Sequence, residues 1–73
     1  MTLIDKLSDL IHSGYKITFN SESRNLVINL SKTINYIIHS KESWLPLHDH
    51  FYEGKIIECL NYMQEEIQKE NTK

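Results

Sequence analysis

Residues 15–40 read YKITFNSESRNLVINLSKTINYIIHS, and this stretch decides the fold. Apolar and polar side chains alternate along it with a period of two, which is typical of strands that bury one face only. The pattern predicts three strands, over residues 15–20, 25–31 and 34–39. The polar run SESRN and a tight turn at Lys32 and Thr33 leave connections that only antiparallel neighbours can use, so the strands should form a meander.

The predicted phasing gives the sheet one apolar face and one mostly polar face. The residues expected on the apolar face, against the core, are Tyr15, Ile17, Phe19, Leu26, Ile28, Leu30, Ile34, Tyr36 and Ile38. The residues expected on the opposite face are Lys16, Thr18, Asn20, Val27, Asn29, Asn35, Ile37 and His39. Val27 and Ile37 would then be apolar positions that no helix covers.

Helical periodicity flanks the strands on both sides. Thr2 and Asp5 have the spacing of a capping box, and an apolar stripe follows, which predicts a helix over residues 3–13 that Gly14 closes. A second helix is expected over residues 49–69, followed by a frayed tail at 70–73. Its predicted core stripe consists of Ile56, Leu60, Met63 and Ile67.

The order of elements predicts a single α+β domain over residues 1–73. Two helices packed on one face of a three-stranded antiparallel sheet bury all the apolar stripes at once. The segment SKESWLPL, between the third strand and the second helix, is expected to be a connection because Pro46 disfavours a helix at Leu45. Trp44, Leu45 and Leu47 should then close one end of the core.

Length and composition restrict the functions worth considering. A chain of 73 residues buries only about 60% of its unfolded surface, which leaves no room for an enclosed active site, so we expect neither an enzyme nor a cofactor. A formal net charge of −2 gives no attraction to nucleic acid or to an anionic membrane. Cys59 is the only cysteine, and the N-terminus lacks the apolar run of a signal peptide, so a reducing, cytoplasmic setting is expected.

The pair His48 and His50 suggests a metal site, and Glu53 is a further candidate ligand. Ligation from positions i and i+2 needs an extended backbone, whereas in a helix the two side chains would diverge by about 200°. No second cysteine or histidine pair completes a zinc spacing. We therefore expect Asp49 to cap the second helix and no metal to bind, with a metal-binding protein that uses His48 and His50 as an alternative.

The uncovered sheet face and the third strand are the predicted contact surface. The string INYIIHS contains no lysine, glutamate or proline, the residues that usually protect an exposed strand edge. We expect this strand to contact a protein partner or a second copy of the chain. The predicted partner-binding residues are Asn35, Ile37, His39, Val27, Asn29, Lys16 and Thr18.

The α-β-β-β-α order resembles that of the double-stranded RNA-binding domain. That family grips phosphates with a cluster of lysines at the start of its second helix. The matching region here reads HDHFYEGK, over residues 48–55, and contains only Lys55. Nucleic-acid binding is therefore an alternative that we do not favour, and it would need Lys16, Arg24, Lys32 and Lys41 to gather on one surface.

A second resemblance covers nearly the whole chain. It rests on the strings LIDKLSDLIHSGYKITFNSES, LVINL, INYIIHS and IIECLNYM. In spacing and residue class these resemble small phage and mobile-element proteins that include type II-A anti-CRISPR inhibitors of a bacterial defence nuclease. The resemblance implies a small non-enzymatic protein that docks onto a host or defence protein. Those inhibitors are strongly acidic and this chain is not, so no inhibitory residue is transferred.

Overall fold

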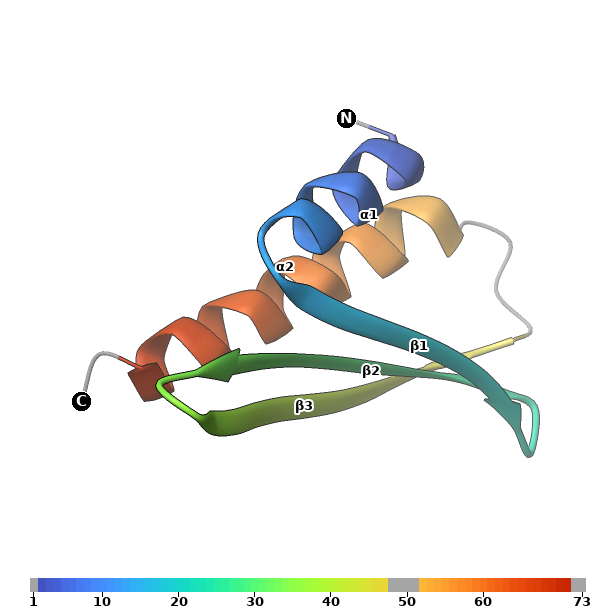
Figure 1. Cartoon of the computed structure of the whole chain (residues 1–73). Helices are drawn as coiled ribbons and strands as arrows, with labels where there is room; N and C mark the ends of the chain where they lie inside the picture. The colour runs from blue at the N-terminus through green and yellow to red at the C-terminus, as the bar shows by residue number, and fades with distance from the viewer. Residues whose placement is uncertain (1, 48–51, 72–73) are drawn as a thin grey trace.

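Two helices and three strands follow one another in the order α-β-β-β-α in the computed structural model, which describes residues 2–47 and 52–71 (Figure 1). The elements are α1 (Leu3–His12), β1 (Tyr15–Glu22), β2 (Asn25–Ile34), β3 (Ile37–Pro46) and α2 (Tyr52–Asn71). The strands form one antiparallel sheet in the order β1-β2-β3. These observations confirm the predicted fold class.

Local sequence signals explain how α1 begins and ends. The Thr2 hydroxyl accepts a hydrogen bond from the Asp5 N–H at 3.2 Å, and the Asp5 carboxylate accepts one from the Thr2 N–H at 3.4 Å. This reciprocal pair is the expected capping box. After His12 the chain turns sharply through Gly14, whose φ of +91° lies in the region that favours glycine. The turn directs β1 back beneath the helix.

Both hairpins close with two-residue turns. Ser23 and Arg24 join β1 to β2, and Asn35 and Tyr36 join β2 to β3. All four residues have positive φ, between 47° and 67°. Positive φ at both central positions identifies the type I′ family, whose twist matches the right-handed twist of the flanking strands.

The predicted boundaries of the third strand, 34–39, are wrong. Lys32 and Thr33 continue β2, the turn lies at Asn35 and Tyr36, and β3 runs on through the segment that we expected to be a connection. The turn is therefore displaced by three residues. Residues that pair across a two-residue turn lie on the same face, so Ile37 continues the covered face of Ile34 and Ile38 lies on the opposite face. The predicted faces of this strand were wrong because they placed apolar residue types inward and did not follow the alternation across the turn.

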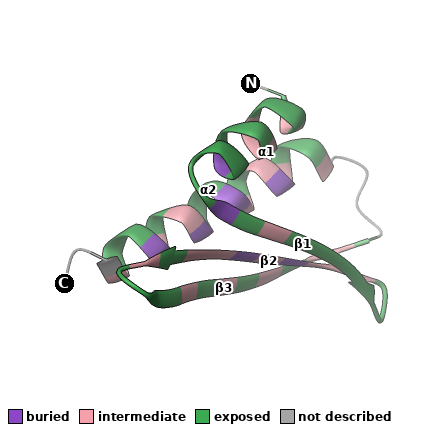
Figure 2. Ribbon diagram, in the orientation of Figure 1, coloured by how far each residue is buried: buried purple, intermediate pink, exposed green. Residues whose placement is uncertain are grey.

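The core lies between the two helices and one face of the sheet (Figures 1 and 2). α1 packs over β1, while α2 crosses β2 and β3. The buried residues are Leu10, Tyr15, Ile28, Leu30, Ile56, Leu60, Met63 and Ile67. All four members of the predicted α2 stripe are among them. Tyr36 and Ile38, which we expected to find in the core, are exposed, because Tyr36 lies in the turn and Ile38 pairs with Thr33 on the face opposite the helices.

The row of β3 that faces α2 is largely polar, unlike the corresponding rows of β1 and β2. His39, Lys41 and Ser43 pair across the ladder with Lys32, Leu30 and Ile28, so they lie on the covered face. Polar groups of α2 meet them. The Cys59 thiol donates to the Ser43 hydroxyl at 3.1 Å, and at the start of the helix the Tyr52 hydroxyl donates to the Pro46 carbonyl. β3 is therefore joined to α2 by hydrogen bonds as well as by packing.

Candidate functional site

The candidate site lies on the sheet face opposite the helices, which we call the open face. The pairing register assigns to it Lys16, Thr18, Asn20 and Glu22 of β1, Val27, Asn29 and Ser31 of β2, and Ile38, Ser40, Glu42 and Trp44 of β3. Five of these eleven side chains are uncharged and polar, three are apolar and three are charged. Uncharged polar groups cost less to desolvate than charges do, which suits a surface that another molecule covers.

Trp44 is the most prominent side chain of the open face. The register places it beside Val27, with Asn20 on the far side of Val27. Its side chain is 61% exposed although it is large and apolar. Exposed aromatic side chains that lie next to other apolar groups are typical of sites at which proteins contact one another.

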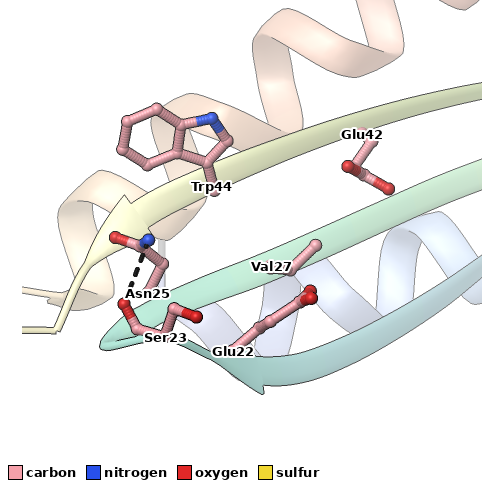
Figure 3. Close-up of a pocket in the computed structure, with 6 residues that line it drawn as sticks. All are labelled: Glu22, Ser23, Asn25, Val27, Glu42 and Trp44. Atoms are coloured by element: carbon pink, nitrogen blue, oxygen red, sulfur yellow. Dashed lines mark hydrogen bonds between the residues drawn. The ribbon is translucent and has the colours of Figure 1, made fainter.

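A shallow hollow of about 300 Å³ surrounds this aromatic side chain (Figure 3). We call it the Trp44 hollow, and its lining residues are Glu22, Ser23, Asn25, Val27, Glu42 and Trp44. All three strands and the first turn contribute to it. The Asn25 side-chain amide donates to the Ser23 carbonyl at 3.4 Å, which ties the start of β2 to that turn.

Two carboxylates give the hollow a negative charge. Glu22 and Glu42 lie on rows at either side of the row that contains Val27 and Trp44. Neither carboxylate has an ion pair or a hydrogen bond to another residue within the described ranges 2–47 and 52–71. No basic residue lines the hollow. Its chemistry therefore suits a cationic group that stacks on the indole ring and lies between the two carboxylates.

Four of the predicted partner-binding residues lie on the open face. They are Lys16, Thr18, Val27 and Asn29, all on the two strands whose register matches the prediction. Asn35 lies instead in the second turn. Ile37 and His39 lie on the covered face, because they pair with Ile34 and Lys32. The placement of these three residues on the open face was wrong. Asn35 was misplaced because the turn lies at residues 35–36, and Ile37 and His39 were misplaced because the predicted faces followed residue type and not the pairing with β2.

His39 and Lys41 of β3 converge on Glu70, near the end of α2. The His39 Nδ1 atom lies 3.2 Å from Glu70 Oε2, and the Lys41 ammonium group contacts Glu70 Oε1. The hydrogen bond from Lys41, and then that from His39, lowers the pKa of Glu70, while the same contact with Glu70 raises the pKa of Lys41. His39 is thus engaged with α2 and is not available to the open face.

Of the three candidate metal ligands, only Glu53 lies among the described residues. His48 and His50 lie outside the described residues, and Glu53 accepts a hydrogen bond from the Leu3 N–H at 2.9 Å. Among the described residues, no group of three or more potential ligands gathers at one place. Glu53 instead joins the start of α2 to the first N–H groups of α1, where a negative charge is favourable.

The basic residues named for the nucleic-acid alternative do not gather on one surface. Lys16 lies on the open face and Arg24 lies in the first turn. Lys32 lies on the other side of the sheet, where its ammonium group is 4.7 Å from the centre of the Tyr15 ring. Lys41, also on that side, is paired with Glu70. These four charges are therefore not arranged so that one phosphate backbone could contact all of them.

The prediction missed Trp44 and Glu42 as surface residues. Both belong to KESWLPL, in which three polar residues precede Trp44 and Leu45 without alternation, and proline suggested a connection. Pro46 ends an outer strand, and proline is tolerated there when its missing N–H would point to solvent. Exposure alternates from Lys41 to Leu45 in the structure, but residue type does not, so the sequence carries no period-two signal for the longer strand.

Comparisons with known proteins found no matching family model, no matching curated protein and no matching solved structure. In the part of the chain that the structure describes, no helix is long and apolar enough to cross a membrane.

Proposed function

We propose that the protein is a small non-enzymatic binding module that docks onto another protein through the open face of its sheet. The observation that carries this proposal is the exposed Trp44 indole, set beside Val27 in a hollow with two carboxylates that have no described partner. The resemblance to anti-CRISPR proteins extends the proposal to a phage or mobile-element protein that inhibits a host or defence protein.

The dimensions of the molecule fit this role. The longest extent of the molecule is 38 Å, and the sheet consists of three strands of eight to ten residues (Figure 1). A standard protein interface buries about 800 Å² on each partner, so we expect the partner to cover the open face together with its flanking turns. Tryptophan near the centre of such an interface often contributes a large share of the binding energy.

The charge of the hollow specifies the chemistry of the partner. Glu22 and Glu42 would leave two buried carboxylates if an apolar group covered them, which is costly. An arginine side chain avoids this cost because its guanidinium group stacks on an aromatic ring and binds carboxylates with two parallel hydrogen bonds. We therefore expect the partner to place an arginine against Trp44.

Capture from a lysate of the native host tests the docking surface. The parent chain and two variants, Trp44→Ser and Tyr62→Ser, serve as baits. Tyr62 is the matched control because it is a similarly exposed aromatic residue, at 64%, and lies on α2. A specific partner should be lost with Trp44→Ser, by about tenfold or more, and retained with Tyr62→Ser. Equal capture by all three baits would contradict the proposal.

Fluorescence tests the chemistry of the partner directly. Trp44 is the only tryptophan, so its emission reports on the hollow alone. A short capped peptide with two arginines should change this emission, whereas the same peptide with glutamates should not. Glu42→Gln should weaken the response to the arginine peptide. Identical responses to both peptides would exclude the charge argument and leave only an apolar contact.

A further inference from the structure

The free edge of β1 is the second surface of interest, and it shares Glu22 with the Trp44 hollow. The strand order β1-β2-β3 leaves one side of β1 unpaired. Glu22 and Asn25 face each other next to the two-residue turn, where the ladder closes with a hydrogen-bonded pair. Hydrogen-bonded and non-hydrogen-bonded pairs then alternate along the strand. The main-chain groups of Tyr15, Ile17, Phe19 and Ser21 are therefore the ones that point to the free edge.

The two outer strands differ in how their edges are protected. β3 carries Lys41 and Glu42 in its middle and Pro46 at its end, all of which discourage the addition of another strand. The expectation that the third strand has an unprotected edge was thus wrong, because it considered only residues 34–40. In β1 the five residues from 17 to 21 are uncharged, and the charges stand at the two ends of that run.

Those terminal charges make β1 complementary to itself. Lys16 lies three residues before Phe19, and Glu22 lies three residues after it. If two copies pair antiparallel about Phe19, Lys16 of each copy stands opposite Glu22 of the other, in a non-hydrogen-bonded position where side chains are closest. A register centred on Ile17 or Thr18 places no charge opposite Lys16.

From this arrangement we infer that the protein forms a symmetric dimer in which β1 of one copy pairs antiparallel with β1 of a second copy, centred on Phe19. The pairing joins two three-stranded sheets into one of six strands. It satisfies the edge-facing main-chain groups of Ile17, Phe19 and Ser21 in both copies and forms two Lys16–Glu22 ion pairs on the open face. On the covered face it brings together the two Phe19 side chains, each 41% exposed in the single chain.

α1 carries an apolar stripe on the same flank of the molecule. Lys6 lies on the flank of α1 that faces α2, where its ammonium group donates to the Gln64 side chain at 2.8 Å. At about 100° per residue, Ile4 and Ile11 lie on the opposite flank, and they are 78% and 62% exposed. α1 packs on β1 and α2 packs on β2 and β3, so the flank of α1 away from α2 lies on the side of the free β1 edge.

A shallow apolar hollow of about 310 Å³ runs along this stripe, lined by Ile4, Leu7, Ser8, Ile11 and His12. In the single chain it exposes large aliphatic side chains to water, which is unfavourable. A second copy paired through β1 brings its own sheet and α1 to this side of the molecule. A second copy of the chain would therefore cover both the exposed stripe of α1 and the free edge of β1.

Sedimentation equilibrium over a concentration series tests the dimer. An edge-to-edge contact is smaller than a standard interface, so the parent should associate reversibly, with dimer appearing as concentration rises. In the dimer, Lys16→Glu places a glutamate opposite Glu22, and Glu22→Lys places a lysine opposite Lys16, at two symmetric positions in each case. Each single variant should therefore weaken association by about tenfold or more. The double variant Lys16→Glu, Glu22→Lys restores opposite charges and should restore association to within a few-fold of the parent.

Glu42→Lys is the matched control, because it makes the same change of charge on β3 and leaves the β1 edge unchanged. It should dimerise like the parent, and melting curves confirm that each exposed substitution leaves the fold intact. A parent that stays monomeric throughout the series would overturn the inference. So would a double variant that fails to recover, or a dimer that Glu42→Lys alone disrupts, since the latter would assign the contact to β3.

Discussion

The two faces of the sheet show how one alternating sequence produces two different surfaces. Adjacent residues of β2 illustrate the difference, since Ile28 is fully buried beneath the helices whereas Val27 lies on the open face beside Trp44. All eight buried residues within the described ranges belong to the helices or to the covered face. The covered face therefore accounts for the core, and the open face contributes no buried residue among those that the structure describes.

Within the covered face, β1 and β3 behave differently. β1 presents Tyr15, Ile17 and Phe19 towards the helices, as the apolar-inward rule predicts. β3 presents His39, Lys41 and Ser43, whose polar atoms are satisfied by Glu70 and Cys59 of α2. A strand can thus lie beneath a helix without an apolar stripe when the helix supplies matching polar groups.

The largest expected effect separates the two faces of β2. Ile28→Ala removes a fully buried side chain and should lower the free energy of unfolding by about 2–5 kcal/mol. The matched control is Val27→Ala, which removes methyl groups from the adjacent residue on the open face and should cost about 1 kcal/mol at most. Urea denaturation measures both. Equal losses for the two variants would mean that the assigned phase of β2 is wrong.

The sequence predicted much of this architecture. Capping, helical period and strict alternation identified α1, β1 and the phase of β2, because in these elements local pattern and burial agree. The third strand was misplaced because Tyr36 and Ile38 resemble core residues, yet both are exposed. The turn at Asn35 and Tyr36 depends on left-handed backbone at two non-glycine residues, which the sequence signals only through Asn35.

The candidate site was predicted only in part, for a related reason. Lys16, Thr18, Val27 and Asn29 follow from the alternation of β1 and β2. The Trp44 hollow depends on β3 continuing to Pro46, and that length is set by pairing with β2 along its whole extent. Pairing between distant segments is a tertiary property, so the local pattern around a proline does not specify it.

A pair of glycines offers a test of intermediate size at the junction that places α1 over the covered face. Gly14 has a φ of +91°, so Gly14→Ala should destabilise the fold by about 1–2 kcal/mol. Gly54 lies in the first turn of α2, where an added methyl group would meet no other atom within 4 Å. Gly54→Ala is the matched control and should raise stability, by up to about 1 kcal/mol. Thermal melts compare the two variants with the parent. If both changes had the same sign, the strain at Gly14 would not be the cause.

The smallest effect concerns the polar contact between β3 and α2. Because Lys41 and His39 hold the pKa of Glu70 below its ordinary value of about 4.3, the ionised carboxylate stabilises the fold above that pH, and this contribution is lost as pH falls through the lowered pKa. The pKa of Lys41 is raised in the folded chain, so the stabilisation that its charged form contributes is present at neutral pH and is lost only in strong alkali. Glu70 is accessible to water, and salt should weaken the contact further.

Glu70→Gln keeps the size of the side chain and removes its charge, so it isolates the electrostatic part of this contact. At pH 7 the variant should melt below the parent by no more than about a few degrees. The gap should narrow as pH is lowered below about 4, because the parent then loses the same charge. Glu65→Gln is the matched control, since Glu65 is exposed on α2 with no ion pair to a described residue, and it should show no such gap. A gap of constant size at every pH would assign the role of Glu70 to packing, and β3 would then be held beneath α2 by shape rather than by charge.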